Sequence, residues 1–89
     1  MRWRVIVRMS FTSDRGSRLR YRVEKSLAEC GIRLIKTTGT WESRAVSAQE
    51  AAKMFHEVFA LLSGLAERGQ HGRGRLNHLW IYIDCAPAT

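Results

Sequence analysis

The alternation of side chains over residues 2–11 constrains the fold of this 89-residue chain more than any other feature. Apolar side chains recur at every second position, at Trp3, Val5, Val7, Met9 and Phe11. The intervening positions carry three arginines, Arg2, Arg4 and Arg8. Because side chains alternate between the two sides of an extended chain, this pattern predicts a strand with one apolar face and one basic face.

Two segments with helical spacing supply the layer that such a strand needs on its apolar side. The first is predicted over residues 17–31, where Gly31 is the expected stop and Ser13 or Ser17 the expected N-cap. The second is predicted over residues 47–67 and begins with Ser47 and Glu50, spaced as in a capping box. Its expected buried stripe consists of Ala51, Met54, Phe55, Val58, Leu62 and Leu65.

Three further segments have the composition of strands, over residues 32–38, 40–44 and 76–85. The predicted order is therefore strand, helix, strand, strand, helix, strand. The economical arrangement is an α+β ferredoxin-like sandwich, with a four-stranded antiparallel sheet and both helices on one face. The length fits one such domain over residues 1–89.

The positive charge is concentrated in one part of the chain. Fifteen basic residues outnumber eight acidic ones, for a net charge of +7. Residues 1–36 hold ten basic against three acidic side chains, and the remainder is balanced. This distribution predicts a polyanionic partner, RNA or DNA.

The sequence also bears on location. No apolar run approaches the ~18 residues of a membrane span, so we expect no membrane partner. The two cysteines, Cys30 and Cys85, are too few for a disulfide scaffold or a zinc site, which favours a cytoplasmic protein.

The uncovered face of the sheet is the first candidate site. The last strand turns Trp80 and Tyr82 toward the face that carries the arginines of the first strand. Such a face suits stacking of single-stranded bases, and it equally suits contact between two subunits of a homodimer. The full set of candidate nucleic-acid-binding residues is Arg2, Arg4, Arg8, Arg15, Arg18, Arg22, Lys25, Arg73, Arg75, Trp80 and Tyr82.

Several local patterns resemble a known group. They are Thr38-Gly39-Thr40-Trp41, the helical segment from Ala52 to Glu57, and the strand from Leu79 to Asp84. With the order of elements, these resemble the virulence-associated protein D family and the related small CRISPR adaptation nucleases. The resemblance implies a ferredoxin-like homodimer that binds nucleic acid and, in active members, cleaves it with a divalent metal.

The family signature is an aspartate at the end of the first strand, where this chain reads Arg8-Met9-Ser10. We therefore expect a homodimeric nucleic-acid-binding protein with nuclease activity that is absent or weak. One alternative is an endoribonuclease of the kind found in toxin–antitoxin pairs, with Asp14 or Asp84 as catalytic candidates and magnesium or manganese as cofactor. The other is an interaction module or inhibitor whose basic surface docks an acidic protein.

Overall fold

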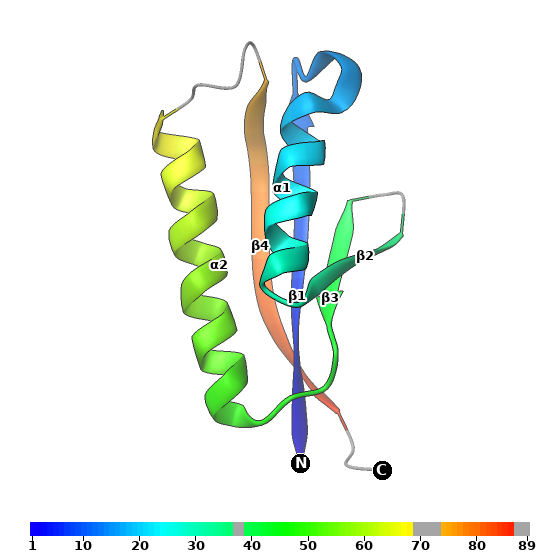
Figure 1. The fold of residues 1–89 in the computed structure, drawn as a ribbon, viewed down its shortest axis with the longest axis vertical. Helices are drawn as coiled ribbons and strands as arrows, with labels where there is room; N and C mark the ends of the chain where they lie inside the picture. The colour runs from blue at the N-terminus through cyan, green and yellow to red at the C-terminus, as the bar shows by residue number, and fades with distance from the viewer. Residues whose placement is uncertain (37–38, 69–73, 87–89) are drawn as a thin grey trace.

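The structure is a computed structural model that describes residues 1–36, 39–68 and 74–86. Its elements follow the predicted order (Figure 1). They are β1 (Arg2–Thr12), the 3₁₀ turn η1 (Arg15–Ser17), α1 (Arg18–Glu29), β2 (Ile32–Lys36), β3 (Thr40–Ser43), α2 (Ala48–Arg68) and β4 (Arg75–Ala86). The strands form one antiparallel sheet in the order β2-β3-β1-β4. Both helices lie on the same side of it (Figure 1), which is the ferredoxin-like fold.

The alternation in β1 sorts the two faces of the sheet as expected. Val5 and Val7 are fully buried and belong to one hydrophobic core with residues of both helices. The register places Ile83 opposite Val5 and Ile81 opposite Val7, so these residues share the helix-covered face. The opposite face, called here the open face, carries Arg8 across from Trp80.

Local contacts set the ends of both helices. Gly31 stops α1 with a φ of +81°, and the N–H of Glu50 donates to Ser47 Oγ at 3.2 Å at the start of α2. The start of α1 is capped by Asp14, where Ser13 or Ser17 was expected, and the side chain of Ser17 lies outside the described part of the structure. The 3₁₀ turn between Asp14 and α1 turns the chain so that the aspartate, five residues before Leu19, reaches the free amides.

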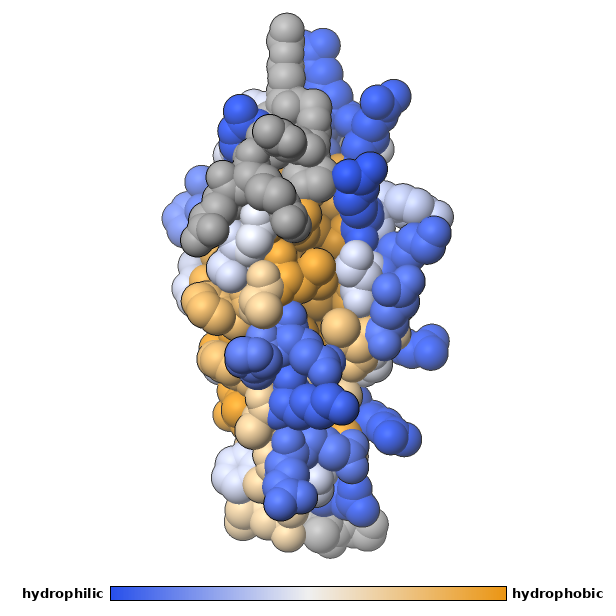
Figure 2. Space-filling view, turned by 60° about the vertical axis from the view of Figure 1, so that its left-hand side comes forward, coloured by the Kyte–Doolittle hydropathy of each residue, from blue (hydrophilic) through white to orange (hydrophobic). Residues whose placement is uncertain are grey.

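The predicted core stripe of α2 was wrong at one position. Val58 and Leu62 are fully buried, but Phe55 is 36% exposed and its neighbour one turn on, Phe59, is 52% exposed. Phe55 lies at the margin of the buried stripe because α2 turns its most apolar side toward the sheet. Figure 2 brings the α2 side of the molecule forward and shows a hydrophobic area beside a band of hydrophilic side chains.

One contact that the sequence does not signal holds the start of β1. The N–H of Trp3 donates to Val46 O and the N–H of Val46 donates to Trp3 O, both at 2.8 Å. This bridge ties the segment before α2 to the sheet. Within the described residues, no helix is long and apolar enough to cross a membrane.

Candidate nucleic-acid interface

The open face holds an arginine that is already engaged. Arg4 Nη2 donates to Asp84 Oδ2 at 2.8 Å, and Arg4 Nη1 lies 3.0 Å from Glu42 Oε1. The guanidinium thus joins β4, β1 and β3 across the middle of the sheet. Two carboxylates offset the charge of Arg4, whereas Arg2 and Arg8, the other two predicted arginines on this face, are exposed.

The two aromatic residues lie on the open face as predicted. Trp80 is 52% exposed and Tyr82 is 44% exposed. The His78 ring stacks on Trp80, with centroids 5.3 Å apart and an interplanar angle of 13°. His78 Nδ1 lies 3.3 Å from Ser10 Oγ, which fixes the imidazole in that position. One side of the Trp80 ring is therefore covered by the protein itself, which reduces the surface left for a stacked base.

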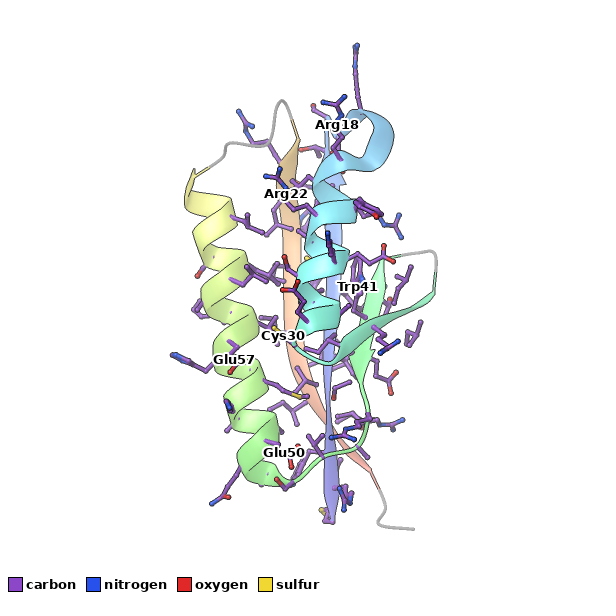
Figure 3. The ribbon with its side chains drawn as sticks, viewed as in Figure 1. Arg18, Arg22, Cys30, Trp41, Glu50 and Glu57 are labelled. Atoms are coloured by element: carbon purple, nitrogen blue, oxygen red, sulfur yellow. The ribbon has the colours of Figure 1, made fainter. Side chains whose placement is uncertain are left out.

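A second basic surface lies on α1. Arg18, Arg22 and Lys25 are exposed and recur at the spacing of one helix face, over about 10 Å of the helix. Tyr21 lies in the same stripe and is 70% exposed. Arg15, in the turn before α1, is also exposed. We call these five residues the α1 stripe; Figure 3 shows Arg18 and Arg22 extending from the N-terminal half of the helix.

The position of these cations works against the stability of the helix. The first turns of a helix carry the positive end of its dipole, which favours acidic side chains and disfavours basic ones. The first turn of α1 contains no acidic residue and begins with Arg18. Helix stability therefore does not explain why arginines crowd this end.

Asp14 is committed to the backbone of α1. The N–H of Leu19 donates to Oδ1 at 2.8 Å and the N–H of Arg20 donates to Oδ2 at 2.9 Å. A Cβ added at Gly74 would lie 3.0 Å from Oδ1, so the start of β4 packs directly against this carboxylate. Both oxygens of this catalytic candidate are thus in use as a helix cap.

The two candidate aspartates are also far apart. Asp84 pairs with Arg4 near one end of β1, and Asp14 follows Thr12 at the other end. Arg4 and Thr12 are eight positions apart on β1, which corresponds to about 26 Å of strand, so the aspartates do not form one site within a chain. Among the residues that the structure describes, no three His, Cys, Asp or Glu side chains are grouped to hold a metal ion.

The remaining sequence candidates fall on different surfaces. The α1 stripe lies on the helix-covered side of the sheet, whereas Arg2, Arg8, Trp80 and Tyr82 lie on the open face. Arg75 is exposed at the start of β4, and Arg73 lies outside the described residues. The candidates therefore do not make one continuous site.

Two other contacts bear on reactivity and charge near α1. Burial, then the charges of Glu57 and Glu29, raise the pKa of the Cys30 thiol; Figure 3 shows Cys30 at the end of α1, with Glu57 on the neighbouring helix. The Arg20 guanidinium lies 5.8 Å from the centre of the buried Trp41 ring. Arg20 thus packs on the core, apart from the α1 stripe.

Sequence reasoning missed Tyr21. The available signal was its position three residues after Arg18 and four before Lys25, which places it on the basic side of the helix.

Comparisons with known protein families, curated proteins and solved structures give no match for this chain.

Proposed function

We propose that the chain binds nucleic acid through the α1 stripe. The observation that carries this proposal is the exposed arginine cluster at the positive end of α1, where the first turn of the helix contains no acidic residue. The helix dipole disfavours cations at this end, whereas phosphate oxygens bind guanidinium groups through two parallel hydrogen bonds. The contacts would go mainly to the backbone, with Tyr21 as a stacking surface for an unpaired base.

The proposed activity is binding without cleavage. Asp14 is engaged with backbone amides and Asp84 with Arg4. The end of β1 offers Met9 and Ser10 where the resembling nucleases place an aspartate. Kinship with the virulence-associated protein D group remains part of the proposal, supported by the ferredoxin-like order of the elements. A cytoplasmic location is likewise proposed, from the free thiols of Cys30 and Cys85.

The salt dependence of binding tests the proposal. Fluorescence anisotropy is measured with a labelled DNA duplex over a range of salt concentrations. With about five phosphate contacts, log affinity falls with log salt at a slope of about −4 to −5. Replacing Arg15, Arg18 and Arg22 together by glutamine removes about three contacts and flattens the slope by nearly three.

A matched variant controls for the loss of net charge. It replaces three exposed arginines of the sheet, Arg2, Arg8 and Arg33, by glutamine. We expect it to keep the steep slope. Equal flattening by both variants would place the site elsewhere or show only a general charge effect, and no binding at low salt would remove the proposal.

RNA cleavage in magnesium or manganese separates binding from the nuclease alternative. We expect no cleavage by the unaltered protein. Cleavage that Asp14→Asn or Asp84→Asn abolishes would overturn this part of the proposal. Salt-sensitive binding to an acidic protein without binding to nucleic acid would instead support the interaction alternative.

A further inference from the structure

Strand β4 forms an edge of the sheet, and its outward backbone groups follow from the register. The N–H groups of Trp3 and Met9 donate toward the β3 side, to Val46 and Gly39. Odd-numbered residues of β1 therefore face β3, and their partners on β4 face away from β1. In the middle of β4 these partners are Leu79, Ile81 and Ile83. Their N–H and C=O groups lie along the open edge.

This edge lacks the charged residues and prolines that usually prevent an exposed strand from pairing with another strand. The segment from Leu79 to Ile83 holds no charge and no proline. Apolar side chains flank it on both faces of the sheet. They are Trp80 and Tyr82 on the open face and, on the helix side, Ile83 at 41% exposure together with Phe55 and Phe59 of α2, which packs over β1 and β4. A patch of this kind marks a binding surface.

We propose that β4 pairs with β4 of a second copy of the chain, antiparallel and about a two-fold axis at Ile81. In this register Trp80 lies opposite the partner's Tyr82, and His78 lies opposite the partner's Asp84. Both pairs share the open face, at positions where antiparallel strands bring side chains closest. His78 uses Nδ1 toward Ser10, so Nε2 is the ring nitrogen for the carboxylate.

The backbone fits the same register. Leu79 pairs with the partner's Ile83 and Ile81 pairs with its own copy, so every outward group of this segment finds a hydrogen bond. The sheets of the two copies become continuous, and Phe55 and Phe59 are covered by the partner's layer. If the two-fold axis lay one residue away from Ile81, Trp80 would no longer lie opposite Tyr82, and His78 would no longer lie opposite Asp84. A centre at Trp80 places Asp84 opposite Leu76, and a centre at Tyr82 places Trp80 opposite Asp84.

This inference does not rest on nucleic-acid binding. It also differs from a dimer in which two open faces close on each other, because it uses the edge of the sheet. The match between a ring nitrogen of His78 and the carboxylate of Asp84, with their spacing about Ile81, is what selects a second copy over a strand of another protein.

Cross-linking across the proposed axis tests the register. Ile81→Cys is made in a background with Cys30→Ser and Cys85→Ser, and the protein is oxidised without nucleic acid. Ile81 faces its own copy, so we expect a disulfide-linked dimer. Leu79→Cys is the matched control, since two copies of Leu79 would lie about 13 Å apart. Equal cross-linking of the two variants, or none with Ile81→Cys, would overturn the register.

Light scattering or sedimentation of the folded protein tests the surface independently of cysteine. Trp80→Lys removes both aromatic pairs and places a charge on the edge, so we expect dimerisation to weaken roughly tenfold or more. Tyr21→Lys makes the same change on α1 and should leave the dimer intact, as should the triple arginine variant of the α1 stripe. A monomer at every concentration, or equal effects of the two lysine variants, would contradict the proposal.

Discussion

Arg4 and Asp84 face each other across the β1–β4 pair, and the guanidinium donates to the carboxylate at 2.8 Å. Glu42 on β3 is the second partner, 3.0 Å away. The guanidinium thus couples three strands that are far apart in the sequence. The Nε of Arg4 is buried and has no hydrogen-bond partner, so the group depends on its two carboxylates for compensation.

Removing one carboxylate should cost little and removing both should cost more. We expect Asp84→Asn to lower the free energy of unfolding by about 0.5–1 kcal/mol, because the pair is partly exposed and Glu42 remains. Glu42→Gln should behave alike, and the double variant should lose more than the sum of the two. Urea denaturation measures all three. Strict additivity would show that the two carboxylates act independently.

The cap of α1 should contribute more to stability than either ion pair. We expect Asp14→Ala to lower the free energy of unfolding by about 1–2 kcal/mol, because two backbone amides lose their acceptor. Asp14→Asn keeps one acceptor oxygen, so its free energy of unfolding should lie between those of the unaltered protein and Asp14→Ala. Ser13→Ala serves as control and should change stability by less than about 0.5 kcal/mol. If urea denaturation showed a larger loss of unfolding free energy for Ser13→Ala than for Asp14→Ala, Ser13 and not Asp14 would be the cap of α1.

The thiol of Cys30 should react slowly. Its pKa is raised by burial, then by Glu57 and Glu29, so at neutral pH a smaller fraction is thiolate, and thiolate is the species that reacts. We expect iodoacetamide to modify the exposed Cys85 first, and the rate at Cys30 to rise with pH later than for an ordinary thiol. Mass spectrometry of time points follows both sites. Glu57→Gln should speed the reaction at Cys30 and leave Cys85 unchanged.

Tyr21 should matter for single strands and not for duplexes. If its ring stacks on an unpaired base, Tyr21→Ala weakens binding of a single-stranded RNA by about 1–3 kcal/mol and leaves the salt slope unchanged. Affinity for duplex DNA, whose bases are paired, should change little. Tyr82→Ala is the matched control on the open face. A greater loss of RNA binding with Tyr82→Ala would locate the stacking surface there.

The periodicity of the sequence predicted the fold because burial acts on it directly. The alternation in β1 and the spacing of Leu19, Val23 and Leu27 both report which side of an element is covered, and these residues are buried. The partners of charged residues depend on how the strands are aligned with one another, and the periodicity of a sequence does not predict that alignment. Arg4 meets Asp84 and Glu42 only because three strands align. Asp14 reaches α1 only because a 3₁₀ turn intervenes, with Gly16 at φ +70°.

The pairing of β1 with β4 also has a consequence for the order of folding events. Arg2 lies opposite Ala86, so β1, one of the two inner strands of the sheet, pairs with the strand most distant from it in sequence. At the usual pace of translation, β4 emerges about 4–15 s after β1. Until then β1 is itself an unprotected sheet edge, with Val5 and Val7 lacking part of their cover. Closure of this long loop should therefore be the slow step of folding, and the interval before it is when a nascent chain would be most exposed to chaperones and to aggregation.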